Sequence, residues 1–170
     1  IGRRMPLMPP YGSLFLDLDD LDEAVVVWTR HQRVPVSEDA RANYRAMLGR
    51  VRDRGWSLGL VAPRHDEIWD EVTHFTQTPA TPEAERRMGR LLEELTPFYE
   101  PPDLAPDARH DVRSIAAPVR AGGRAVMALV LYGLPAGASA AQVEQWVARL
   151  SATADAVASE LALAPVPAVV

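Results

Sequence analysis

Residues 65–74 combine side chains that can bind metal ions. If this segment is helical, Asp66, Asp70 and His74 share one face because they are four residues apart, and Glu71 with His74 forms a Glu-x-x-His pair. A di-iron carboxylate site needs that pair twice and two further glutamates, but the sequence holds the pair once. The spacing of the two histidines, His65 and His74, matches no zinc motif. We therefore interpret the segment as a solvated acidic helix face and predict no metal site and no cofactor.

Other catalytic patterns give little support for an enzyme. The sequence has no phosphate-binding loop and no dinucleotide fingerprint. The four histidines, which fall in predicted polar segments or loops without a paired nucleophile, are His31, His65, His74 and His110. We predict that the chain is not an enzyme and that it has no catalytic residues.

Composition limits the class of protein further. A chain of 170 residues is long enough for one domain with a real core. The absence of cysteine excludes disulfides and thiolate metal sites and favours a reducing, cytoplasmic location. A net charge of −5 argues against nucleic-acid binding by this segment, because phosphate contacts need clustered positive charge. No stretch is long and apolar enough to span a bilayer, so we predict no membrane partner.

The elements that must position any site alternate between helices and strands. Three helices follow from apolar stripes at helical spacing, with an acidic start at residues 17–22, an N-cap at Ser37 and a start at Thr81-Pro82. Gly55 ends the second helix, and residues 56–61 read as a strand. The predicted stripes are Leu21, Ala24, Val25 and Trp28; Tyr44, Met47, Leu48 and Val51; and Met88, Leu91, Leu92 and Leu95.

The last third of the chain has the clearest pattern. Residues 112–119 and 125–132 predict two strands joined by a turn at Gly122-Gly123, the second strand being apolar on both faces. Ser139 caps a long helix that keeps its apolar phase for five turns. This pattern predicts an α/β (α+β) fold in which helices pack over a mostly antiparallel sheet. Three strands are few for so many helices, so we expect strands upstream of Ile1 to complete the sheet.

Three segments together carry a family resemblance. They are residues 1–7 followed by Gly12, residues 50–57, and residues 111–133 with the alanine-rich helix after them. In this order, and over most of the chain, they resemble the effector-binding domain of IclR-type transcription regulators. The resemblance implies a GAF-like antiparallel sheet flanked by helices, with a long C-terminal helix. It divides the chain into a domain of residues 1–161 and a flexible tail of residues 162–170.

The resemblance also implies a function. It implies a sensor that binds a small-molecule effector, either a small organic acid or an aromatic metabolite, and that controls DNA binding by a winged helix-turn-helix upstream. The start at Ile1 without an initiator methionine leads us to expect such an upstream part, through which alone the protein would contact DNA. Self-association as a dimer or tetramer is expected, with residues 63–95 adding to an interface. The alternative is a stand-alone GAF-like sensor or signalling module without a DNA-binding function.

The candidate ligand-binding residues follow from the resemblance. Tyr132 ends a strand where the resembling proteins place pocket-facing polar side chains, with Val130 nearby and Ser114 on the neighbouring strand. A second set at a helix N-terminus offers backbone donors for a carboxylate or hydroxyl; this set is Tyr11, Gly12 and Ser13. Tyr132 as a core aromatic with a satisfied hydroxyl is the alternative. The stretch 62–110 is far longer than the usual link in the family, so the family's ligand cannot be transferred.

Overall fold

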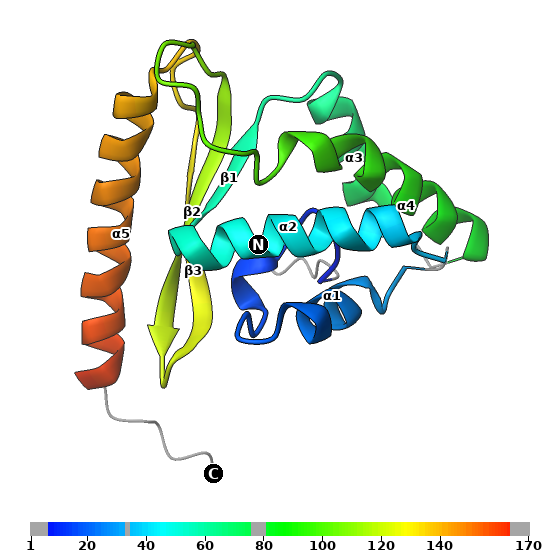
Figure 1. Ribbon diagram of the computed structural model, residues 1–170, viewed down its shortest axis with the longest axis horizontal. Coiled ribbons are helices and arrows are strands. Elements are labelled where there is room, and N and C mark those ends of the chain that lie inside the picture. Colours follow the sequence, from blue (N-terminus) through cyan, green and yellow to red (C-terminus); the bar gives the residue numbers. More distant parts are fainter. Residues whose placement is uncertain (1–6, 33–34, 76–80, 164–170) are drawn as a thin grey trace.

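The computed structural model describes residues 7–32, 35–75 and 81–163. They form a mixed α/β arrangement of five α-helices, two short 3-10 helices and one sheet of three strands (Figure 1). The elements in chain order are η1 (Ser13–Phe15), α1 (Leu21–Thr29), α2 (Glu38–Arg54), β1 (Ser57–Leu60), α3 (His65–Phe75), α4 (Pro82–Leu95), η2 (Thr96–Phe98), β2 (Val112–Ala121), β3 (Arg124–Tyr132) and α5 (Ala140–Leu163).

The sheet is antiparallel throughout, as predicted, with the strand order β1-β2-β3. Gly122 and Gly123 turn the chain between β2 and β3 with φ values of 57° and 80°, which favour residues without a side chain. Because residues 125–132 are apolar on both faces, the sequence predicts that this strand is buried on both sides, and this prediction was wrong. Among the described residues β3 is an edge strand, and its Val126 and Met127 side chains are about half exposed.

One face of the sheet is covered by α5 (Figure 1). Ile115 and Val119 of β2 are fully buried there, and Val143 and Ala154 come from the helix. The N-cap prediction is confirmed, because the hydroxyl of Ser139 accepts the backbone N–H of Gln142 at 3.3 Å. The helix continues to Leu163, two residues into the predicted tail, and residues 164–170 lie outside the described part. None of the described helices combines the length and apolar character needed to cross a membrane.

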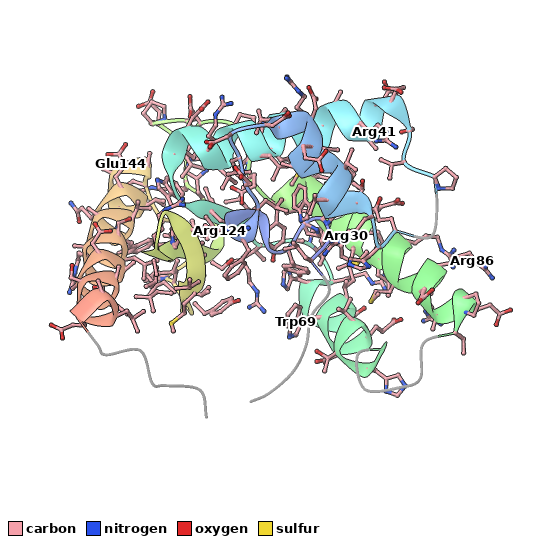
Figure 2. All side chains as sticks on the ribbon, turned by 90° about the horizontal axis from the view of Figure 1, so that it is seen from below. Arg30, Arg41, Trp69, Arg86, Arg124 and Glu144 are labelled. Atoms are coloured by element: carbon pink, nitrogen blue, oxygen red, sulfur yellow. The ribbon has the colours of Figure 1, made fainter. Side chains whose placement is uncertain are left out.

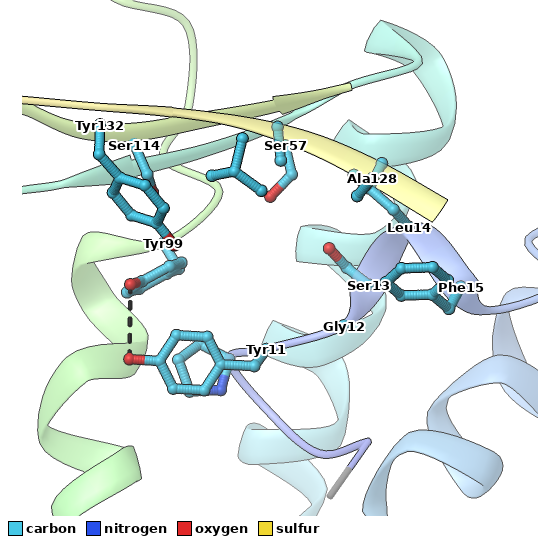
Figure 3. A pocket seen from close by; sticks show the side chains of 13 residues that line it. Tyr11, Gly12, Ser13, Leu14, Phe15, Ser57, Tyr99, Ser114, Ala128 and Tyr132 are labelled. Carbon is cyan, nitrogen blue, oxygen red and sulfur yellow. Dashed lines mark hydrogen bonds between the residues drawn. The ribbon is translucent and has the colours of Figure 1, made fainter. Parts of the chain in front are cut away.

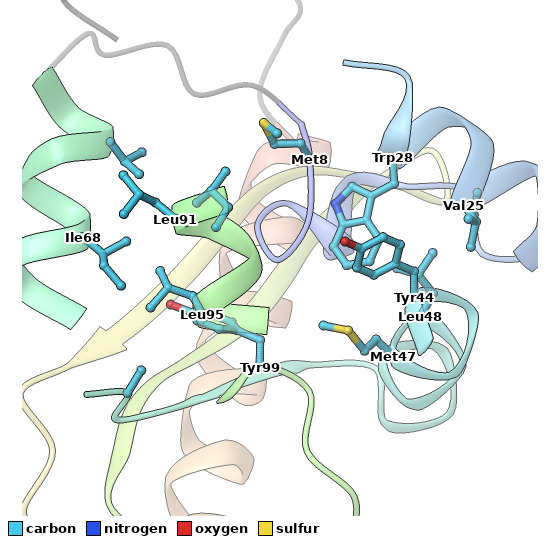
Figure 4. Packing of buried hydrophobic residues seen from close by; sticks show 14 residues of the cluster. Met8, Val25, Trp28, Tyr44, Met47, Leu48, Ile68, Leu91, Leu95 and Tyr99 are labelled. Carbon is cyan, nitrogen blue, oxygen red and sulfur yellow. The ribbon is translucent and has the colours of Figure 1, made fainter. Parts of the chain in front are cut away.

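The other side of the sheet carries a second core built by the first four α-helices (Figure 4). All three predicted stripes face it: Trp28, Leu48 and Leu95 are completely buried, whereas Met88 is only partly so. The helix starts agree with the capping rules, since Asp20, Ser37 and Thr81 each accept a backbone N–H of the first turn. The rings of Trp28 and Tyr44 meet edge to face at 5.7 Å.

The long stretch 62–110 contains a helical pair inserted between β1 and β2. Helices α3 and α4 pack against each other, and η2 then returns the chain to the outer edge of β1. Tyr99 forms an antiparallel bridge with Gly59, and the backbone N–H of Glu100 donates to the carbonyl of Leu58 at 2.8 Å. The insertion therefore brings two residues that are distant in sequence to the edge of the sheet.

Candidate functional site

A pocket of about 140 Å³ lies between the sheet and the segment that precedes α1 (Figure 3). All six residues predicted from the sequence line it: Tyr11, Gly12, Ser13, Ser114, Val130 and Tyr132. The lining also includes Phe15, Ser57, Tyr99 and Ala116.

The floor of the pocket consists of two rows that cross the sheet. Ser57 on β1 is in register with Ala116, which is in register with Val130. In the next row Ser114 stands between Gly59 and Tyr132. Residues two apart on a strand face the same side, so both rows point away from α5 and towards the pocket. Ala116 lies at the centre of this floor.

The opposite wall comes from Tyr11, Gly12 and Ser13, but not in the predicted form. Gly12 enters a single turn of 3-10 helix, η1, and the first α-helix begins only at Leu21. The acidic segment between them decides this, because Asp20 caps the later helix. A predicted array of donors at an α-helix N-terminus is therefore absent from this part of the pocket.

One end of the pocket is aromatic. The rings of Tyr11 and Tyr99 meet edge to face at 5.3 Å, and the Tyr99 hydroxyl donates to the Tyr11 hydroxyl at 3.5 Å (Figure 3). Trp69 of α3 packs edge to face against Tyr11 from outside at 5.5 Å. Burial raises the pKa of both tyrosines, so both phenols stay neutral. Gly59 makes room for this end, because a Cβ there would lie 3.0 Å from the Tyr99 ring.

The rim of the pocket is open. Tyr132 is 62 % exposed and its neighbour Val130 is 42 % exposed. Phe15 stands at the rim of the other end, about half exposed. Tyr132 is therefore not a core aromatic, and its ring is free to contact a bound molecule.

Serine hydroxyls mark the other end, with a buried acid behind them. Glu100 is fully buried, and Oε1 of its carboxylate accepts the hydroxyls of Ser57 and of Ser13, the latter at 3.4 Å. The backbone N–H of Leu58 donates to Oε2 at 3.2 Å. All three hydrogen bonds to this carboxylate come from neutral groups, which is unusual for a buried charge.

The surroundings of Glu100 hold it in a costly state. Its φ of 48° lies in the left-handed region, which few residues other than glycine adopt. Arg50 donates from Nε to the backbone carbonyl of Glu100 at 2.6 Å and not to its carboxylate. Burial raises the pKa of Glu100 to about 7, against the opposing effects of its hydrogen bonds and of nearby Arg54. Near neutral pH the carboxyl is therefore close to half protonated.

Sequence reasoning missed Glu100, Tyr99 and Ser57. Ser57 stands in a Gly-x-Ser-x-Gly pattern, from Gly55 to Gly59, that resembles the nucleophile elbow of hydrolases. That elbow joins a strand to a following helix, whereas here a helix precedes the pattern and β1 carries the serine. The pattern could have pointed to Ser57, but not to the hydrolase chemistry. Nothing local in residues 97–106, a proline-rich loop, indicates that Glu100 would be buried.

Neither metal ligation nor a known relative identifies this site. The His, Asp and Glu side chains of the described residues form no group of three that could hold a metal ion. Comparisons with models of protein families, with curated proteins and with solved structures found no match to this chain.

Proposed function

We propose that this chain is a small-molecule sensor domain and that the pocket between the sheet and η1 binds its effector. One observation carries the proposal: four parts of the chain converge on one concave site, namely residues 10–15, Ser57 of β1, Tyr99 in the turn after α4, and the hairpin of β2 and β3. Aromatic and apolar walls with a few polar groups are the usual construction of a ligand pocket.

The effector is small. A cavity of about 150 Å³ in an engineered protein accommodates benzene, and the pocket here, of about 140 Å³, has a similar volume but an open rim. Of the two ligand classes that the sequence favours, the aromatic metabolite is supported by the tyrosines. An organic acid would bring its own carboxylate close to the buried Glu100 carboxylate, and the repulsion between these like charges disfavours it.

We propose further that the domain belongs to a transcription regulator of the IclR type and acts on an upstream winged helix-turn-helix. The resemblance of residues 1–7 with Gly12, of residues 50–57 and of residues 111–133 supports this, and the net charge of −5 suits a part that does not itself contact DNA. A stand-alone GAF-like sensor is the second candidate. Sequencing the gene upstream of Ile1 separates them, since only the regulator has a winged helix in the same reading frame.

The binding function is tested by thermal unfolding in the presence of a metabolite library. A ligand at about a hundred times its Kd stabilises a folded protein by about 2.7 kcal/mol, which raises Tm by roughly 5 to 10 °C for a chain of this size. Ala116→Leu extends a side chain from the centre of the floor and should abolish the shift. Ala152→Leu, at an exposed position of α5, is the matched control and should preserve it. Hits that survive Ala116→Leu unchanged would place the ligand elsewhere.

A further inference from the structure

The hydrogen bonds at the serine end fix what this end offers to a ligand. An ionised carboxylate only accepts hydrogen bonds, so Ser13 and Ser57 must give their single hydroxyl protons to Glu100. What remains for the pocket are the oxygen lone pairs of both serines. This end of the pocket is therefore an acceptor surface, suited to a ligand group with N–H or O–H donors.

The negative charge of Glu100, which lies behind these serines, also favours a ligand group that is a hydrogen-bond donor. Two cations of α2 lie near Glu100 and donate to backbone carbonyls: Arg50 to the Glu100 carbonyl, and Arg54 to the carbonyl of Pro101 at 2.6 Å. Arg54 also lies 3.7 Å from Asp103. Within the described part of the chain, neither guanidinium makes an ion pair with the Glu100 carboxylate. Arg54 favours the ionised form of Glu100 only through longer-range charge, so a cationic ligand group beside the serines would add a closer counter-charge.

The aromatic end has the opposite electrostatic character. Arg113 lies close enough to Tyr11 and Tyr99 to oppose the rise in their pKa, and it is paired with Asp66 of α3 at 3.0 Å. A cation at this end would meet the like charge of Arg113, whereas a neutral aromatic ring can pack edge to face against the tyrosines. The two ends thus call for an aromatic body at the tyrosines and a cation at the serines.

We propose that the ligand is a small arylalkylamine, with its ammonium group between Ser13 and Ser57, facing Glu100, and its ring against Tyr11, Tyr99 and Tyr132. This proposal rests on the proposed sensor function and names the ligand class. Figure 3 shows the three tyrosines at one end of the pocket and Ser13 and Ser57 towards the other.

Binding of such a cation is coupled to the proton of Glu100. A protonated carboxyl donates to one serine, whose own proton then turns towards the pocket and makes it a donor surface. The cation therefore selects the ionised form, and the amine is bound as a proton leaves. With the pKa of Glu100 at about 7, one linked proton makes amine binding about tenfold tighter near pH 8 than near pH 6.

Calorimetric titration of the chain with benzylamine, benzoate and benzyl alcohol tests the proposal. These probes share one ring and differ in the charge of the polar group, and benzylamine stays cationic over this pH range. We expect benzylamine to bind more than about tenfold tighter than benzoate at pH 8. Its affinity should fall about tenfold towards pH 6, and Glu100→Gln should remove that pH dependence. Titrations in two buffers of different ionisation heat should show proton release from the wild type.

Two results would overturn the proposal and leave the sensor function standing. The first is that benzoate or benzyl alcohol binds as tightly as benzylamine and that Ala116→Leu abolishes this binding. The second is that the affinity of the wild type for benzylamine does not change with pH. This result does not depend on whether any variant folds. If no probe binds at millimolar concentration the amine proposal is wrong. The sensor function then falls only if the metabolite library also fails.

Discussion

The hydroxyl of Ser57 donates to the carboxylate of Glu100 across 43 residues of chain, so a wall residue of the pocket shares a hydrogen bond with a fully buried acid. The contact arises because β1 begins just after the end of α2 at Gly55, and because the chain returns along the outer edge of β1 after α4. Protonation of Glu100 therefore affects the stability of the fold and the polarity of the pocket together.

Glu100 should make the protein less stable as the pH rises. The unfolded chain loses this proton near the ordinary pKa of 4.5, whereas the folded protein keeps it to about 7. Between these values the folded state binds more protons, so the free energy of unfolding falls with rising pH and stays lower above 7. One pKa unit corresponds to about 1.4 kcal/mol, which makes the total effect about 3 kcal/mol. In urea unfolding, the free energy of unfolding of the wild type should fall by this amount, relative to that of Glu100→Gln, between about pH 4.5 and pH 8.

The control for this experiment is Glu160→Gln, at an exposed position of α5. Its stability should follow that of the wild type across the same range, because an exposed carboxylate changes its surroundings little on folding. A wild-type curve that runs parallel to the Glu100→Gln curve at every pH would contradict the assignment of a perturbed Glu100.

Gly59→Ala should disturb the aromatic end of the pocket. A Cβ at this position would lie 3.0 Å from the Tyr99 ring and 3.0 Å from the Ser114 hydroxyl, closer than ordinary contact. The ring must move, at a cost of about 1 to 3 kcal/mol in unfolding free energy. Ligands found by thermal shift should also lose affinity.

Gly89→Ala is the matched glycine control. Gly89 lies inside α4, and a Cβ there meets no atom within 4 Å. The substitution should stabilise the protein by about 1 kcal/mol through helix propensity and leave ligand binding unchanged. Equal effects of the two substitutions would show that Gly59 has no special role at the site.

Tyr132 should contribute to binding and not to stability. Its side chain is 62 % exposed, so Tyr132→Ala should change the free energy of unfolding by less than about 0.5 kcal/mol. The loss of a ring contact worth about 1 kcal/mol should weaken an aromatic ligand several-fold. Tyr132→Phe keeps the ring and should bind nearly normally unless the hydroxyl meets the ligand. Titration of the three proteins with one ligand separates these cases.

The capped helices and the hairpin could be predicted because their signals are local. Ser37, Thr81 and Ser139 cap helices through contacts within four residues, and the apolar stripes need only one turn of helix to be recognised. The six lining residues were predicted from the family resemblance. Strand alternation explains why Ser114, Val130 and Tyr132 share one face of the sheet.

The remainder of the site depends on contacts that no local pattern encodes. Tyr99 and Glu100 reach the pocket only through the return of the chain after α4, and a charged residue in a proline-rich loop is normally exposed. An α-helix was expected to begin at Gly12, but only one turn of 3-10 helix forms there, because Asp20 caps the later helix α1. Long-range burial thus decides the electrostatics of this pocket.

The chain should self-associate, and β3 offers the surface for it. Among the described residues four of the eight large exposed apolar side chains belong to this strand, and its outer edge pairs with no other strand. Strands upstream of Ile1 or a second copy of the chain could cover such an edge. By contrast, the outward positions of α3 and α4 carry charged side chains such as Arg86, seen at the end of the molecule in Figure 2.

Light scattering at tens of micromolar checks this prediction. The wild type should have the mass of a dimer or tetramer. The double substitution Val126→Lys and Met127→Lys should convert it to a monomer, because charged side chains on an edge strand prevent strand pairing. These two positions lie outside the pocket lining, so ligand binding should persist in the variant. Arg86→Glu on α4 is the comparison. If that substitution dissociates the protein and the lysines do not, the interface lies within residues 63–95, as the sequence alone suggests. A wild-type monomer at this concentration would count against self-association of the chain.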